Sequence, residues 1–146
     1  MERPEIKGIA HVAFLAHDME KMMDFYCGVL GFRKKFLLSD ETGRPWIQYI
    51  EVAPRQYLEF FYDYRGLIPQ NSFERMAKLE RLGPMHLSLE VTGIRELTER
   101  LRQNGVNIVS ELSLGSDHTW QIWFEDPEGN PIEFHEYTET SWQLMK

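Results

Sequence analysis

The strongest constraint on the fold is a repeat, because the two halves of the chain show the same order of predicted elements. In the first half, hydrophobic periodicity and turn signals predict a strand, a helix and three further strands at 6–15, 19–30, 32–38, 46–52 and 56–62. The same order returns in the second half, at 84–91, 94–103, 106–111, 120–125 and 131–137. His11 and His86 lie 75 positions apart, and Glu59 and Glu133 lie 74 apart. The pattern therefore predicts two similar supersecondary units.

The repeat also defines the expected domain organisation. We expect one domain over residues 6–137, with a first module at 6–62 and a second at 84–137. The stretch between them, 63–83, is the least patterned part of the chain, and we interpret it as a linker with a short helix at 72–82. A chain of 146 residues is long enough for one compact domain of this kind.

Composition excludes several classes of partner. The chain has 16 Lys and Arg against 23 Asp and Glu, a net charge of −7, so it lacks the basic surface that nucleic acids or anionic membranes require. Its only cysteine, Cys27, permits neither an intramolecular disulfide nor a cysteine-based zinc site. No apolar run approaches the roughly 20 residues of a membrane span. We expect a soluble, cytoplasmic protein without nucleic-acid or membrane partners.

Four residues stand out as candidate metal ligands, since each half places a histidine on its first strand and a glutamate on its last. They are His11, Glu59, His86 and Glu133. Two matching strand pairs would bring all four together. Imidazole and carboxylate ligands suit Ni, Co, Zn, Fe or Mn, and two carboxylates offset the charge of a divalent ion.

Each of these residues also has a simpler interpretation. A lone histidine on an apolar strand, such as His11, is more often a hydrogen-bonded core residue. Glu59 and Glu133 could face solvent from edge strands, although a carboxylate in an apolar strand is rarely buried without a partner. The occurrence of all four at matching positions favours the metal site.

Four segments carry a resemblance to a known family. They are Ile9-Ala10-His11-Val12-Ala13-Phe14 with Val29-Leu30-Gly31-Phe32, then Pro84-Met85-His86-Leu87-Ser88-Leu89, and finally Glu125-Asp126-Pro127-Glu128-Gly129-Asn130-Pro131-Ile132-Glu133. Together they resemble the vicinal oxygen chelate superfamily of glyoxalase I-like proteins over about residues 6–137. The resemblance implies an α+β fold in which two paired βαβββ modules form a curved, barrel-like mixed sheet around a metal site. It also implies a homodimer, with the modules paired within one chain or across two.

The resemblance further implies an activity. The expected enzyme is a metal-dependent lyase or isomerase of the glyoxalase I type, with Ni, Co or Zn favoured over Fe or Mn. It would transfer a proton at a carbon next to a chelated carbonyl through a metal-bound enediolate. Either Glu133 or Glu59 would act as the base, and we favour Glu133.

The substrate is less constrained than the chemistry. Glutathione-using relatives carry Arg and Asn where this chain has Leu15 and Asp63. The expected substrate is therefore a thiol adduct of a 2-oxoaldehyde or an acyl-CoA. Two alternatives stay open: an acyl-CoA epimerase of the methylmalonyl-CoA type, whose members usually carry Gln in place of Glu59, and a resistance protein that sequesters a small molecule.

Two further histidines are secondary candidates. Strand alternation puts His135 on the same face as Glu133, either as a pocket residue or at an exposed rim. His118 belongs to the loop 115–119, which is either a flap over the metal or an ordinary surface loop. The basic run 33–35 could meet an anionic substrate tail or simply be a solvated strand end.

Overall fold

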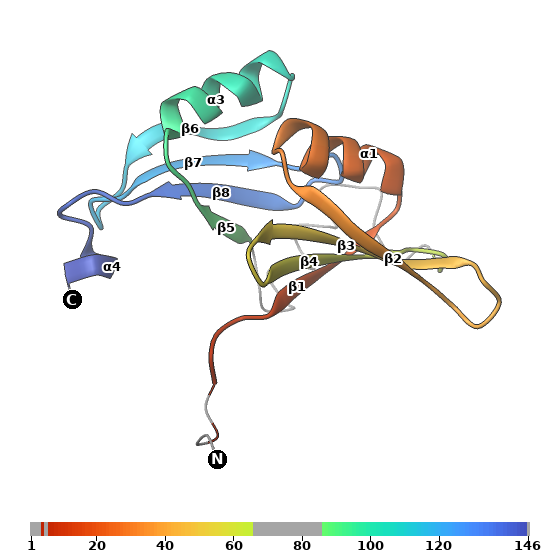
Figure 1. The fold of residues 1–146 in the computed structure, drawn as a ribbon. Coiled ribbons are helices and arrows are strands. Elements are labelled where there is room, and N and C mark those ends of the chain that lie inside the picture. The colour runs from red at the N-terminus through yellow and green to blue at the C-terminus, as the bar shows by residue number, and fades with distance from the viewer. Residues whose placement is uncertain (1–3, 5, 66–85, 146) are drawn as a thin grey trace. The chain divides into compact units, whose positions relative to one another are not determined.

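The computed structural model describes residues 4, 6–65 and 86–145. Contacts divide the chain into two compact units, Met1–Ile68 and Pro69–Lys146. Each unit contains one four-stranded mixed sheet and few helices, so the predicted α+β class and the predicted repeat are confirmed (Figure 1). None of the described helices is both long and apolar enough to pass through a membrane.

The two units share one topology. The first consists of β1 (His11–Ala16), α1 (Met19–Met23), the π-helical turn η1 (Asp24–Val29), β2 (Arg33–Ser39), β3 (Pro45–Ala53) and β4 (Gln56–Tyr62). The second consists of β5 (Leu87–Glu90), α3 (Ile94–Gln103), β6 (Ile108–Leu114), β7 (Trp120–Glu125), β8 (Pro131–Glu136) and the short helix α4 (Trp142–Met145). The strand orders are β1-β4-β3-β2 and β5-β8-β7-β6, with the first pair parallel and the others antiparallel in both sheets.

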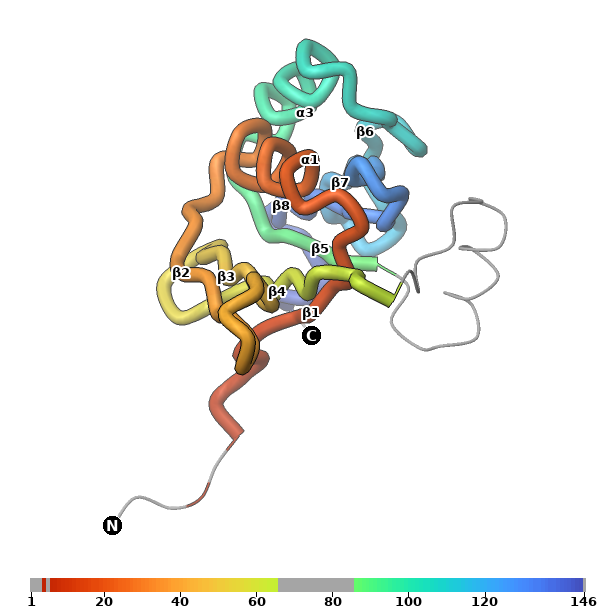
Figure 2. Tube along the Cα trace, turned by 90° about the vertical axis from the view of Figure 1, so that its right-hand side faces the viewer, coloured from red at the N-terminus to blue at the C-terminus, as the bar shows by residue number. Residues whose placement is uncertain are grey.

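In each unit, one face of the sheet packs under a helix (Figures 1 and 2). Phe60 on β4 is completely buried, and its ring lies 5.5 Å from that of Phe14 and 4.8 Å from that of Tyr26 in η1. Phe134 on β8, 74 positions after Phe60, is also buried and lies 4.7 Å from the ring of Phe124. Since side chains alternate along a strand, burying these rings turns Glu59 and Glu133 to the opposite faces.

Local sequence determines where the helices begin and end. The carboxylate of Asp18 accepts a hydrogen bond from the backbone N–H of Lys21 and so caps α1. Gly31 and Gly105 follow the helical segments with φ of +81° and +67°, as the sequence predicted for helix ends. Glu136 at the end of β8 accepts hydrogen bonds from the backbone N–H groups of Gly93 and Ile94, at 3.0 and 2.8 Å, where α3 begins.

The first strand is shorter than predicted. Ile6 and Ile9 are 99% and 81% exposed, and the segment before β1 runs away from the sheet (Figure 2). The reason is the register: β4 begins at Gln56 and pairs with β1 only from His11 onward, so residues 6–10 have no neighbouring strand. The predicted helix at 72–82 and most of the predicted linker lie outside the described residues.

The buried ring of Phe60 generates a prediction about stability. Replacing Phe60 with Ala leaves a cavity against Phe14 and Tyr26, and we expect the free energy of unfolding to fall by about 3–5 kcal/mol. Urea denaturation would measure it. The matched control is Phe36→Ala on β2, whose side chain is exposed and whose loss is expected to cost less than about 1 kcal/mol. Equal losses from the two variants would contradict this account of the core.

The turn between β2 and β3 generates a second prediction. Asp40 accepts hydrogen bonds from the Thr42 hydroxyl at 2.6 Å and from the backbone N–H groups of Thr42 and Arg44, and these bonds lower its pKa to about 2. Because the folded-state pKa lies below the unfolded one, the stabilisation is present above about pH 4 and is lost as the pH falls toward 2. Denaturation midpoints of wild type and Asp40→Asn should therefore differ near neutral pH and converge near pH 2. A difference that does not depend on pH would refute the prediction.

Candidate metal centre

Glu59 and His11 form the first half of the candidate centre. β4 lies between β1 and β3, so Glu59 is on an interior strand and is only 7% exposed. Nε2 of His11, at the first residue of β1, lies 3.0 Å from Oε2 of Glu59. The hydroxyl of Tyr49, directly across from Glu59 on β3, donates a hydrogen bond to Oε1.

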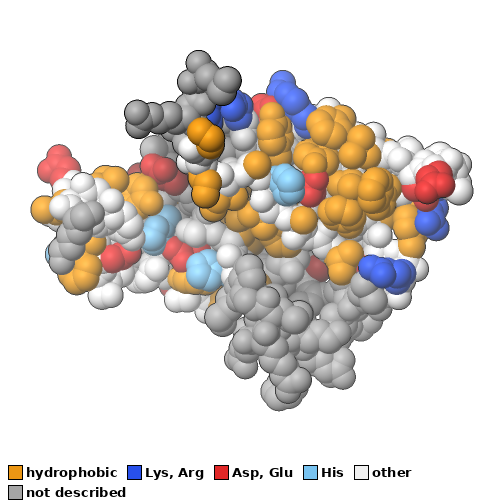
Figure 3. Space-filling model, turned by 90° about the horizontal axis from the view of Figure 1, so that it is seen from below, with side chains coloured by type: hydrophobic (Ala, Val, Ile, Leu, Met, Phe, Trp, Pro, Cys, Tyr) orange, Lys and Arg blue, Asp and Glu red, His pale blue; other side chains and the backbone are white. Residues whose placement is uncertain are grey.

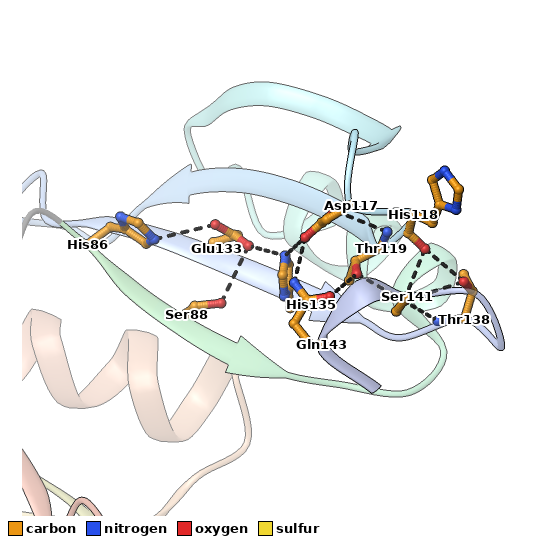
Figure 4. A network of polar contacts seen from close by, with 10 residues as sticks. All are labelled: His86, Ser88, Asp117, His118, Thr119, Glu133, His135, Thr138, Ser141 and Gln143. Atoms are coloured by element: carbon orange, nitrogen blue, oxygen red, sulfur yellow. Dashed lines mark hydrogen bonds and ion pairs between the residues drawn. The ribbon is translucent and has the colours of Figure 1, made fainter. Parts of the chain in front are cut away.

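Glu133 and His86 form the second half in the same way. β8 is also an interior strand, and Glu133 is 5% exposed. Nε2 of His86, just before β5, lies 3.4 Å from Oε2 of Glu133. Nε2 of His135 lies 2.7 Å from Oε1, close enough for its N–H to donate, and the Ser88 hydroxyl lies 3.5 Å from the same oxygen (Figure 4).

These positions decide between the interpretations of the individual residues. The side chain of His11 is 45% exposed, so it is not a core histidine. Glu59 and Glu133 are buried on interior strands, so the interpretation as solvent-facing residues of edge strands is wrong. A buried carboxylate needs compensating donors, and each of these two has a histidine and a second polar side chain.

The donor set fits a divalent metal ion. Imidazole nitrogens and carboxylate oxygens are ligand atoms that such ions prefer, and the two units hold them 3.0 and 3.4 Å apart. Among residues 4, 6–65 and 86–145, no group of three or more His, Cys, Asp or Glu side chains is placed to hold a metal. Each unit thus brings together two of the predicted ligands, and the four-ligand site stays a prediction.

The first unit surrounds its histidine and glutamate with aromatic rings. The Tyr49 ring stacks on Phe36 at 4.4 Å and lies edge-on to His11 and Tyr57 at 6.2 and 6.3 Å. Figure 3 shows this sheet face, with hydrophobic side chains gathered around a histidine. Leu15 pairs with Phe61 two positions beyond the Ala13–Glu59 pair, so it lies on the same face, and it is partly exposed.

The basic residues at the start of β2 are occupied by another contact. Arg33 and Lys35 form ion pairs with Glu51 at 3.0 and 2.9 Å. The hydrogen bond from Lys35 is the largest effect that holds the pKa of Glu51 below its ordinary value. These two cations are therefore partly neutralised, and they offer less to an anionic substrate tail than the sequence suggested.

The second unit surrounds its histidine and glutamate with polar groups (Figure 4). Asp117 lies 4.0 Å from Nε2 of His135 and accepts hydrogen bonds from Gln143 and from the backbone of Thr119. The hydroxyls of Thr119 and Ser141, both fully buried, bond to each other at 2.9 Å. These contacts tie the loop 115–119 to the segment at α4.

The two secondary histidines have different surroundings. His135 contacts Glu133, so the expectation that they share a face is confirmed. The imidazole of His118 points away from Glu133 and lies 6.2 Å from the ring of Trp142 (Figure 4). Sequence reasoning missed Tyr49, Ser88 and Asp117, because their roles depend on strand register and on the path of the loop.

Comparison with known proteins agrees with this architecture. The family model described as the Glyoxalase/Bleomycin resistance protein/Dioxygenase superfamily matches residues 8–134. An Escherichia coli (strain K12) protein named "Uncharacterized protein YaeR" is 26% identical, with 90% of this chain and 97% of the relative covered. A lactoylglutathione lyase of Neisseria meningitidis (serogroup A / serotype 4A) is 28% identical, with coverages of 86% and 88%.

A solved structure has a similar fold. The glyoxalase family protein from Enterococcus faecalis is 28% identical, with a TM-score of 0.70 and coverage of 89% of this chain and 98% of that one. Since the family model spans most of the sequence and both sheets share one strand order, the chain belongs to the glyoxalase/bleomycin resistance protein/dioxygenase superfamily.

Proposed function

We propose that this protein is a metal-dependent lyase or isomerase of the glyoxalase type, which transfers a proton at a carbon next to a carbonyl. The observation that carries the proposal is the pair of buried carboxylates, each with one oxygen facing a histidine. Relatives named lactoylglutathione lyase, at 28–29% identity, support it.

The metal would be held by His11, Glu59, His86 and Glu133. Because each unit supplies only two of these ligands, we propose that the two modules pair, within one chain or across a homodimer, to complete the site. A bound divalent ion, with Ni, Co or Zn favoured, would act as a Lewis acid on two neighbouring substrate oxygens and stabilise the negative charge that develops there.

The chain's own carboxylates would move the proton. Oε1 of Glu133 lies 2.7 Å from Nε2 of His135 and close to Ser88, so Oε2 would take the proton from the substrate carbon after it releases the metal. Glu59 is the second candidate, with Oε1 bonded to Tyr49 and Oε2 turned toward His11. Burial of both carboxylates excludes water that would otherwise exchange the proton.

The proposed substrate is the thiol adduct of a 2-oxoaldehyde. The aromatic rings of Phe36, Tyr49 and Tyr57 beside Glu59 offer apolar surface for the organic part of such an adduct. Leu15 and Asp63 provide no cation for the carboxylates of a thiol peptide such as glutathione.

The proposal predicts metal-dependent turnover. Protein loaded with nickel should isomerise the methylglyoxal adducts of glutathione or of 2-mercaptoethanol, and chelation should abolish the activity. Replacing Glu133 with Gln removes the favoured base, and we expect kcat to fall by about 10²–10⁴-fold. Steady-state kinetics with both adducts would measure the effect.

The matched control is Glu136→Gln on the same strand. Glu136 bonds to the start of α3 rather than to a histidine, so its replacement should leave kcat near the wild-type value. Protein that holds nickel by elemental analysis but turns over neither adduct would contradict the proposal. Turnover of the mercaptoethanol adduct alone would exclude glutathione as the thiol while leaving the reaction class intact.

A further inference from the structure

In each of the two candidate ligand carboxylates, Glu59 and Glu133, the two oxygens have different partners. In both, Oε2 faces a histidine, at 3.0 Å for Glu59 and 3.4 Å for Glu133. In both, Oε1 is held by a different side chain of the same sheet: the Tyr49 hydroxyl for Glu59 and Nε2 of His135, at 2.7 Å, for Glu133. Thus Oε1 of each carboxylate contacts Tyr49 or His135, and Oε2 of each faces His11 or His86.

The side chains that hold Oε1 occupy different positions in the repeat. Tyr49 lies directly across from Glu59 on β3, and Trp123 lies at the matching place across from Glu133 on β7. His135 is two residues after Glu133, and Phe61 is two residues after Glu59. Each sheet therefore has, at these two places, one side chain that contacts Oε1 and one aromatic ring that does not, with the order exchanged.

Because different residues contact Oε1 in the two sheets, the feature that the two sites share is the contact itself. Trp123 packs edge-on against His86 at 4.4 Å and makes no bond to the carboxylate, so in the second sheet the donor comes from β8 itself. A carboxylate with one oxygen fixed by a donor cannot rotate freely. Groups that bond to metal ligands set their orientation in this way.

His135 has support of its own. Asp117 lies 4.0 Å from its Nε2, and Asp117 is held by the Gln143 amide at 2.6 Å and by the Thr119 backbone N–H at 3.2 Å (Figure 4). His135 is mostly buried, with 16% of its side chain exposed. The imidazole therefore keeps its place beside Glu133.

We propose that Tyr49 and His135 are positioning residues that fix Oε1 of Glu59 and of Glu133 and so direct Oε2 of each toward the metal. The inference rests on the proposed function only in taking the His–Glu pairs as metal ligands. Tyr49 and His135 are not themselves ligands in it; they act through the carboxylates. If they only compensated for carboxylate burial, their loss would change stability and leave metal affinity unchanged.

Cobalt(II) titration of the full chain tests the inference without measuring activity. Tyr49→Phe and His135→Phe each remove one donor and keep a ring. We expect each to raise the Kd for cobalt by about 10–100-fold and to shift the visible absorption of the bound ion, because the carboxylate is less well oriented. Circular dichroism would confirm that each variant folds.

The chain offers matched controls for both substitutions. Tyr62→Phe removes a hydroxyl at the end of β4, on the sheet face opposite to Glu59, and His118→Phe removes an imidazole that points away from Glu133. Both should bind cobalt with the wild-type Kd and spectrum. His135→Gln keeps an N–H donor near the position of Nε2, so its Kd should lie between those of wild type and His135→Phe.

Three results would overturn the inference. They are wild-type cobalt binding by both Phe variants, equal losses in the Phe variants and their controls, and a Gln variant no better than His135→Phe. The proposed function fails separately, when wild-type protein binds cobalt or nickel but transfers no proton in either adduct. In that case the roles of Tyr49 and His135 can still be read from the titrations.

Discussion

The burial of one carboxylate in the middle of each sheet is the constraint on which the rest of the arrangement depends. Glu59 and Glu133 lie on interior strands and are almost completely removed from solvent. A charge in that position is costly unless polar groups compensate for it. The aromatic face around Glu59 and the polar network around Glu133 are two different surroundings for the same buried group.

The sheet order explains why both carboxylates lie at the same point of their modules. The last strand of each unit inserts between the first and third, and its helix-covered face carries Phe60 or Phe134 while its other face carries the glutamate. The parallel neighbour supplies the histidine near its start, and the antiparallel neighbour supplies Tyr49 or Trp123. One folding pattern, used twice, thus gives the same histidine–glutamate geometry twice.

Much of this could be predicted from the repeat alone, since the order of elements along the chain, the helix ends and the His–Glu positions follow from spacing and alternation. Tyr49 could not. A regular register from the Ala53–Gln56 pair would put Ile50 opposite Glu59, but the irregularity between Glu51 and Ala53 brings Tyr49 there instead. His135 lies on the same strand as Glu133, so alternation along β8 is enough to place the two on one face. The four-ligand site depends on how the modules pair, which no local pattern contains.

The contact between Glu136 and the start of α3 has a consequence for charged ligands. Free backbone N–H groups at a helix start attract phosphates and other anions. In this protein the carboxylate of Glu136 already accepts from Gly93 and Ile94, so the protein supplies its own anion there. A nucleotide-bearing thioester would have to find countercharge for its phosphates at some other part of the surface.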